Sequence, residues 1–389
     1  MTAPISASRR EFLKAGGLLV GFSLSGSALA PQLMAAETAA APAPGRLDSW
    51  LQIGMDESIR VFTGKVDIGM GVETALMQIV AEELDVAPGR LRFIMGDTAA
   101  TPDQGGVGGS TSISAGAKPL RNAAATARMV LLQLASSRLG APAAQLEVHD
   151  GTVSVKGDPA KSISYGALAG SDELKEALRV SGGGFALNVE GPGRPKDPSS
   201  YTVVGRSLPR VDLPPKILGQ AVYSTDVRVP GMLHGRVVRP AAAGARFVSL
   251  DETAAKKIPG YSRVVVKGNF VGVVAKTEWA AIRAAQELEV VWSTPTTLFP
   301  GDLFAHMRSA KPAATRQLLN QGDAAKALST AARKIEATYE WPFQAHATMG
   351  PGCAVADVRP GGVTTVWSGA QKPHALQKGL AQLLGLPDN

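Results

Sequence analysis

Two glycine-rich turns contain the residues of this chain best suited to bind a large ligand. The first turn lies in the stretch 64–85 and the second in the stretch 105–116, and apolar residues at helical spacing follow each of them. Glycine allows a ligand to approach the backbone, and the first N–H groups of a helix have no partner within it, so they favour an anion. The contacts we expect come from Gly69, Met70, Gly71, Gly108, Gly109, Ser110, Thr111 and Ser112.

The two turns in series favour one large anionic ligand. Taken alone, either turn is explained equally well by close packing, and each helix terminus contributes only about 0.3–1 kcal/mol toward a negative charge. Tight binding therefore needs further hydrogen bonds, which the hydroxyl groups of the second turn could supply. Neither turn is a P-loop, because no Gly-Lys-Ser/Thr follows, and the segment 108–112 lacks the closing glycine of a nucleophile elbow.

Regular patterns around the turns predict the elements that position them. A helix follows the first turn, and a long helix begins near Pro119 after the second. The dipeptide Asp150-Gly151 predicts a hairpin. The first helix buries Val72, Leu76, Ile79, Val80 and Leu84. The strands expected in this part of the chain cover 47–53, 58–63, 90–96, 145–149 and 152–156.

The rest of the chain predicts a second α/β or α+β domain and a third segment that could contact the ligand. Gln371 stands at a strand-to-helix junction, where its amide can donate and accept, although a capping or surface role is the alternative. The helix after it begins near Pro373 and has Leu376, Leu380, Leu383 and Leu384 inward. The expected strands cover 236–239, 263–267, 270–275, 288–292, 334–339, 354–358 and 363–367, and the other helices cover 251–258 and 278–287.

Composition excludes several classes of site. The 389 residues carry a formal charge of +7 with no single basic run, so nucleic acid is not an indicated partner. Cys353 is the only cysteine, which excludes an internal disulfide, a Cys-x-x-Cys-His haem site and a cysteine-ligated iron–sulfur cluster. The five histidines are far apart and form no His-Glu-x-x-His motif. Any metal must therefore be held mainly by another group.

The N-terminus predicts export. Arg9 and Arg10 form a twin-arginine pattern, and the uncharged stretch 15–30 that follows is shorter than the ~20 residues of a spanning helix. We expect a signal peptide over 1–36, cleaved between Pro31 and Gly45, with an uncleaved anchor or a chance Arg-Arg pair as the alternative. A linker over 37–45 and domains over 46–204, 205–295 and 296–389 follow.

Several long motifs then resemble one family in the order that this family shows. The segments GKVDIGMGVETALMQIVAEELDV, GGSTSIS, VDLPPKILGQAVYSTDVRVPGMLHGRVVRP and VWSGAQKPHALQKGLAQLLGLPDN are similar to the molybdenum-cofactor subunit of the xanthine dehydrogenase and aldehyde oxidase family, in its exported isoquinoline 1-oxidoreductase beta-subunit type. The resemblance implies a mixed α+β and α/β fold. Pieces of two molybdopterin-binding domains then surround an α/β hammerhead domain, and the second of them is incomplete at the C-terminus.

The resemblance also implies a chemistry. Molybdenum, held by molybdopterin in its cytidine dinucleotide form, hydroxylates an electron-poor carbon of an aldehyde or an N-heteroaromatic ring, with water as the oxygen source. Gln371 then takes the place of a glutamine near the metal. The implied partners are a small [2Fe–2S] subunit, a cytochrome c subunit in some complexes and a second chain that supplies the C-terminal half, and the implied location is the periplasm or the periplasmic face of the inner membrane.

The chain departs from the family pattern at three points. Met70 replaces a glutamine in the first turn, and Gly350 stands where a glutamate is expected. The glutamate base of the family falls beyond the present pattern, so we expect no catalytic residue in this chain. Glu73, Glu82 and Glu83 could substitute for it, but their helical placement favours solvated or structural roles. The alternatives are a truncated, non-catalytic fragment and, less favoured, an unrelated phosphate-binding α/β protein.

Overall fold

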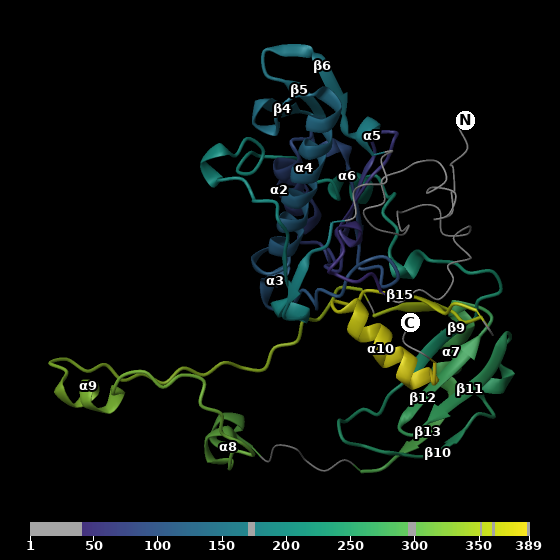
Figure 1. The fold of residues 1–389 in the computed structure, drawn as a ribbon. Helices are drawn as coiled ribbons and strands as arrows, with labels where there is room; N and C mark the ends of the chain where they lie inside the picture. The colour runs from purple at the N-terminus through teal and green to yellow at the C-terminus, as the bar shows by residue number, and fades with distance from the viewer. Residues whose placement is uncertain (1–40, 170–175, 295–300, 351, 360–361, 387–389) are drawn as a thin grey trace. The chain divides into compact units, whose positions relative to one another are not determined.

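The computed structural model describes residues 41–169, 176–294, 301–350, 352–359 and 362–386. The predicted signal peptide lies outside these ranges. The chain divides into two compact units, one formed by Met1–Val227 and Gly352–Asn389 and the other by Arg228–Pro351 (Figure 1). The domain boundaries expected from the sequence stay a prediction. Among the described residues, no helix has the length and apolar character needed to span a bilayer.

A small sheet and two helices form the core of the first unit. Strand β1 (Leu51–Ile53) pairs antiparallel with β2 (Ile59–Thr63), and β2 pairs parallel with β3 (Leu91–Met95). Helix α2 (Val72–Leu84) connects the parallel pair and packs against α4 (Ala117–Leu139). These elements bury their apolar faces against one another, which confirms the helical patterns of the sequence. The largest fully buried apolar side chains here include Trp50, Leu51, Ile59, Leu76, Leu84, Leu120 and Leu131.

A second, three-stranded sheet follows α4. Strands β4 (Leu146–His149) and β5 (Thr152–Val155) form the predicted hairpin, and β6 (Asp158–Ser164) adds an edge strand that the sequence analysis missed because its residues are mostly polar and exposed. Short elements complete this part of the unit. They are the helices α3 (Thr111–Ser114), α5 (Tyr165–Leu168) and α6 (Leu213–Ile217), and the paired strands β7 (Arg179–Ser181) and β8 (Asn188–Glu190).

The second unit contains two separate sheets. Strands β9 (His234–Val238), β11 (Tyr261–Lys267) and β12 (Phe270–Ala275) form one sheet in the order β11-β12-β9, on which α7 (Glu278–Glu287) packs, and β10 (Phe247–Asp251) pairs with β13 (Glu289–Trp292). The helix predicted over 251–258 was wrong. Asp251 belongs to strand β10, where it pairs with Glu289 of β13. The residues that follow form only a 3-10 turn over Ala255–Lys257.

The remaining part of this unit is mostly exposed. It contains the short helices α8 (Leu303–Ser309) and α9 (Ala324–Thr330). The strand predicted over 334–339 was wrong, because these residues are exposed and no strand pairs with them in the described part of the chain.

The C-terminal segment belongs to the first unit. Strands β14 (Ala354–Asp357) and β15 (Thr365–Ser368) pair antiparallel, and α10 (Pro373–Leu384) follows at the predicted position. The predicted inner face of α10 was only partly right. His374 and Ala381 are its buried residues, while Leu383 and Leu384 are 57% and 47% exposed. The helix therefore contacts the unit through His374 and Ala381, while its last turn is exposed.

Two buried carboxylates fix the outer face of α2. Glu82 accepts hydrogen bonds from the N–H groups of residues 202–204 at 2.9, 2.6 and 2.9 Å. Glu83 accepts from the N–H of Lys196 at 3.1 Å and from Nε of Arg121 at 2.8 Å. Both side chains are buried. These glutamates hold the segment that follows β8 against α2, so the structural role expected for them is confirmed.

We expect Glu82→Ala to lower the free energy of unfolding by about 3–5 kcal/mol, because it leaves three N–H groups without their buried acceptor and removes one of the two carboxylates that pair with the Lys196 ammonium. Chemical denaturation at pH 7 measures the difference, with the exposed Glu147→Ala as the control. A loss below about 1 kcal/mol, the range of a surface charge, would contradict this role.

The same group predicts a pH dependence of stability. Burial raises the pKa of Glu82, but hydrogen bonds from the N–H groups of residues 202–204 and the Lys196 charge outweigh it and leave the pKa lowered. Because the folded pKa lies below the unfolded value of about 4.3, this stabilisation is present above that pH and is lost as pH falls through the folded pKa. Denaturation curves below pH 5 should therefore show a shallower decline for Glu82→Gln than for the wild type.

Candidate functional site

The first glycine turn adopts a conformation that requires glycine. Gly69 and Gly71 have φ values of 110° and 74°, in the left-handed region that side chains disfavour. No heavy atom lies within 4 Å of a Cβ placed on Gly69, while Arg210 packs closely on Gly71 and donates to the carbonyl of Gly69 at 2.9 Å. The side chain of Met70 between them is 48% exposed. The turn thus presents open backbone at Gly69.

The N–H groups expected to bind an external anion at this turn are already bound by a side chain of the protein. Oδ1 of Asp67 accepts from the N–H groups of Gly69 at 2.8 Å and Gly71 at 3.2 Å, and its Oδ2 accepts from the N–H of Glu73 at 3.2 Å. The carboxylate therefore satisfies the N–H groups and the positive end of α2 that we expected an external anion to use. An Asp shortly before a Gly-x-Gly turn is a local signal for this hydrogen bonding, which the sequence analysis did not use.

The second glycine turn also differs from the expectation. Gly109 and Ser110 have left-handed φ values of 67° and 57°, and the helix that follows directly, α3, has only four residues. The long helix α4 starts at Ala117, after the buried Gly116, so the N–H groups of its first turn do not belong to the turn at Gly109. The turn therefore offers open backbone and hydroxyl groups. The long helix predicted near Pro119 is confirmed, but it begins after Gly116 and not directly after Gly109.

The hydroxyl of Ser112 is a buried polar group without a partner. The residue is 5% exposed, and its Oγ makes no hydrogen bond in the described structure. Thr111, beside it, donates to the carbonyl of Gly108 at 3.0 Å. No heavy atom lies within 4 Å of a Cβ placed on Gly108. A buried donor that lacks a partner is uncommon in folded proteins, so this turn fits a ligand that brings hydrogen-bonding groups.

Two polar side chains that the sequence analysis missed tie the first stretch to the second. The buried Lys65 donates from Nζ to the carbonyls of Gln104 at 2.8 Å and Gly106 at 2.7 Å, and burial lowers its pKa. Oε1 of Gln104 accepts from Oγ1 of Thr63 at 2.6 Å, and its Nε2 donates to the carbonyl of Gly116 at 3.0 Å. No local pattern reveals this link, because Lys65 and its acceptors are separated by 39 and 41 residues.

The structure brings Gln371 to the second glycine stretch. Its carbonyl accepts from the N–H of Val107 at 3.1 Å, and its side chain is exposed. One turn later, the buried His374 lies 3.5 Å from Oγ1 of Thr101, and burial lowers its pKa. Nζ of Lys378 adds an ion pair with Asp103 at 3.5 Å. The N-terminal half of α10 therefore fixes the Gln371 junction beside the turn.

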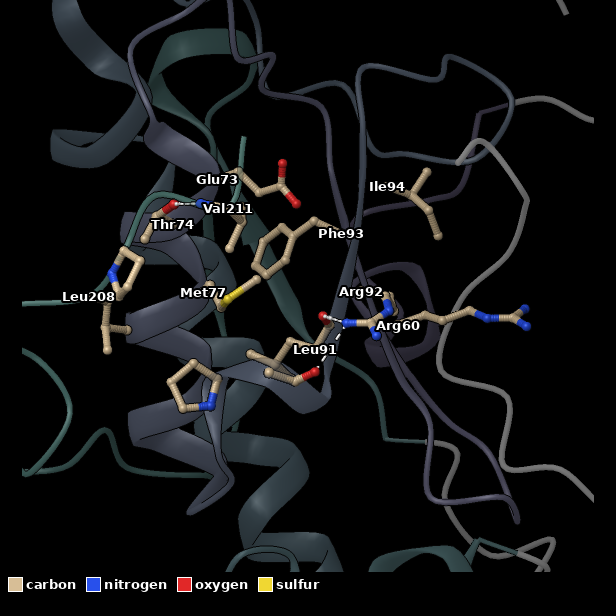
Figure 2. Close-up of a pocket in the computed structure, with 13 residues that line it drawn as sticks. Arg60, Glu73, Thr74, Met77, Leu91, Arg92, Phe93, Ile94, Leu208 and Val211 are labelled. Atoms are coloured by element: carbon tan, nitrogen blue, oxygen red, sulfur yellow. Dashed lines mark hydrogen bonds between the residues drawn. The ribbon is translucent and has the colours of Figure 1, made fainter. Parts of the chain in front are cut away.

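A cavity of about 740 Å³ lies next to the first turn but contains none of the predicted contact residues (Figure 2). Burial raises the pKa of Glu73 in its wall, and the charges of Asp67 and Asp212 add to the shift. The expectation that both turns bind one large ligand stays a prediction. The cavity is lined by Arg60, Glu73, Thr74, Met77, Pro88, Gly89, Leu91, Arg92, Phe93, Ile94, Leu208, Pro209 and Val211.

We expect Asp67→Ala to destabilise the first unit by about 1–2 kcal/mol, the usual effect of removing a side-chain acceptor at a helix start. Asp67→Asn should have a smaller effect, because its amide oxygen can replace one of the two acceptors. Thermal unfolding of both variants beside the wild type measures the order. Equal stability of Asp67→Ala and wild type would show that water satisfies these N–H groups as well as the carboxylate does.

Among the described residues, no group of three or more His, Cys, Asp or Glu side chains could hold a metal ion. A family model described as a molybdopterin cofactor-binding domain matches residues 5–216, and a second model with the same description matches residues 308–389. Both glycine turns lie within the first match, and Gln371 lies within the second.

Curated relatives carry names of the same group. A nicotinate dehydrogenase subunit of Pseudomonas putida is 41% identical over 345 residues, which cover 86% of this chain and 28% of the relative. The beta subunit of isoquinoline 1-oxidoreductase from Brevundimonas diminuta is 29% identical over 427 residues, which cover 99% of this chain and 54% of the relative. A membrane-bound aldehyde dehydrogenase of Gluconacetobacter polyoxogenes is 28% identical, over 99% of this chain and 50% of its own length.

The chain thus spans about half the length, or less, of these curated relatives. A solved structure of a Cu,Mo-CO dehydrogenase is 27% identical over 31% of this chain and 15% of its own, with a TM-score of 0.28. The match over residues 5–216 extends across more than half of the sequence. The chain belongs to the molybdopterin cofactor-binding family, among the molybdenum-cofactor-binding large subunits of the xanthine dehydrogenase family.

Proposed function

We propose that this chain binds molybdopterin, in its cytidine dinucleotide form, for an exported molybdenum hydroxylase. The observation that carries the proposal is the second glycine turn, which combines open backbone at Gly108 with the buried, unpartnered hydroxyl of Ser112 four residues later. The Gln371 junction is fixed to the same stretch through Val107. When bound, the cofactor supplies the oxidation of an electron-poor carbon with oxygen from water.

The residues of this chain hold and orient that cofactor. Gly108 and Gly109 allow close approach to the backbone, and Ser110, Thr111 and Ser112 provide hydroxyl groups. The exposed amide of Gln371 can donate and accept on the α10 side of the turn. At the first turn, Gly69, Met70 and Gly71 contribute surface and close approach, because Asp67 already satisfies the N–H groups of both glycines.

The three glutamates of helix α2 that could substitute for the family's base have other surroundings in the structure. Glu82 and Glu83 each accept buried hydrogen bonds from backbone N–H groups, which leaves them unsuited to abstract a proton from a substrate. Glu73 lines the neighbouring cavity, which contains none of the predicted cofactor contacts, and burial raises its pKa. We therefore assign the base of the reaction to none of these three residues.

The names of the relatives support the substrate class and the kind of assembly. They include a nicotinate dehydrogenase, an isoquinoline oxidoreductase and an aldehyde dehydrogenase, two of them named as subunits. We propose an N-heteroaromatic or aldehyde substrate, a small [2Fe–2S] partner subunit and, in addition, a cytochrome c as electron acceptors. The sheet β11-β12-β9 with α7 forms the proposed α/β hammerhead domain.

A second candidate is a non-catalytic scaffold that does not bind the cofactor. Its support is the first turn, where Asp67 already satisfies the N–H groups of Gly69 and Gly71, together with the engagement of Glu82 and Glu83 in structural hydrogen bonds. Binding of molybdopterin distinguishes the two candidates, because a scaffold without the cofactor would remain metal-free when it is folded.

We expect the folded chain, purified from cells that make molybdopterin, to contain molybdenum and to release cytidine monophosphate on acid hydrolysis. Ser112→Ala should lower the molybdenum content about tenfold, by loss of about one hydrogen bond to the cofactor. Its melting temperature should not fall, because the hydroxyl has no partner in the described structure. Metal analysis and thermal unfolding measure both, with the exposed Ser137→Ala on α4 as the control. A folded, metal-free wild type would refute the cofactor assignment.

The export proposal rests on the sequence alone. We expect Arg9→Lys with Arg10→Lys to leave the protein in the cytoplasm with its precursor length, because the translocation pathway reads the arginine pair. Cell fractionation and mass spectrometry of the N-terminus measure location and cleavage, and Lys14→Arg serves as the control. Equal periplasmic amounts of the wild type and the double variant would rule out this route.

A further inference from the structure

Lys65 is a fully buried cation whose ammonium donates to two main-chain carbonyls, and the charge of Asp103 also stabilises it. Its Nζ lies 2.8 Å from the carbonyl oxygen of Gln104 and 2.7 Å from that of Gly106. The ring of Phe185 lies 5.3 Å from the same nitrogen, so the π face can take the remaining charge. No ion pair of Lys65 occurs within the described residues. Burying an ammonium in this way is costly unless its acceptors are held in place.

One peptide unit connects this ammonium to the Gln371 junction. The carbonyl of Gly106 accepts from Lys65, and the N–H of the same peptide, on Val107, donates to the carbonyl of Gln371 at 3.1 Å. A Cβ placed on Gly106 would lie 2.9 Å from that carbonyl oxygen and 2.4 Å from Cγ of Lys372. The lysine therefore fixes the orientation of the peptide on which the Gln371 main chain rests.

The stem of the lysine fixes the other end of the second stretch. A Cβ placed on Gly116 would lie 2.5 Å from Cε of Lys65, so the glycine leaves space for the side chain that crosses it. Gln104 reinforces the same arrangement through its bonds to Thr63 and Gly116. Both ends of the turn that contains Gly108, Gly109 and Ser112 are thus attached to the strand end that carries Lys65.

We propose that Lys65 is a positioning residue for the cofactor site, whose buried ammonium holds the second glycine turn and the Gln371 junction in their binding arrangement without touching the cofactor. This inference rests on the proposed function. It assigns to the lysine a role that differs from that of a phosphate-binding lysine, because its donors are directed at Gln104 and Gly106 and the side chain is sealed from solvent.

The test compares Lys65→Met with a variant that destabilises the unit elsewhere. Methionine keeps the unbranched stem but has no donor, whereas Val153→Ala removes buried volume from the sheet β4-β5-β6, far along the chain from both turns. Each protein, with any subunit that co-purifies, is isolated from cells that make molybdopterin. Hydrogen exchange of the amides in 105–112, melting temperature and molybdenum per folded chain are measured.

We expect Lys65→Met to exchange these amides about tenfold faster and to hold about tenfold less molybdenum, which is the factor for one charge-assisted hydrogen bond. Val153→Ala should change neither the exchange rate of these amides nor the molybdenum content, even when it lowers the melting temperature as much as Lys65→Met does. If Lys65→Met does not fold, Lys65→Gln, whose amide can donate to one carbonyl, takes its place.

The outcomes separate this inference from the proposed function. A wild type without molybdopterin overturns both. A loaded wild type together with an equally loaded Lys65→Met overturns the inference alone, and so does an equal loss of molybdenum in Val153→Ala, because that loss would reflect stability and not position.

Discussion

The ammonium of Lys65 is removed from solvent, so the carbonyls of the second glycine stretch must face inward to balance its charge. This requirement sets the direction of the peptides at Gln104 and Gly106. Because a peptide is planar, a carbonyl that faces the lysine sends the following N–H the opposite way, and the N–H of Val107 meets the carbonyl of Gln371. A single buried charge thereby relates three segments that are distant in the sequence.

Carboxylates form structural hydrogen bonds at both ends of helix α2. Asp67 satisfies the N–H groups at the start, and Glu82 and Glu83 hold the chain that follows β8 near the end. An external anion at the first turn would have to compete with Asp67 at close range, where like charges repel. Of the two turns, the second therefore contains the buried polar group that lacks a partner in the described structure, the hydroxyl of Ser112.

The sequence predicted those elements whose signals are local. Helices α2, α4, α7 and α10 and the hairpin β4-β5 depend on periodicity, proline and turn residues within one window, and each was found. The predictions were wrong where the formation of an element depends on a pairing partner elsewhere in the chain. Strand β10 forms because β13 pairs with it about forty residues later, and the segment 334–339 has strand-like residues without a paired strand in the described structure.

The same distinction explains what the sequence revealed of the candidate site. Glycine turns are visible because the left-handed conformations of Gly69, Gly71 and Gly109 require this residue. The partners of those turns are not visible, because a lysine after a strand looks like a solvated cation until its acceptors are known. Lys65 and Gln104 are polar residues that fold inward, and only the three-dimensional path of the second stretch supplies their carbonyl and amide partners. A glycine-rich motif thus marks where a cofactor can approach, whereas the shape it meets depends on buried polar groups outside the motif.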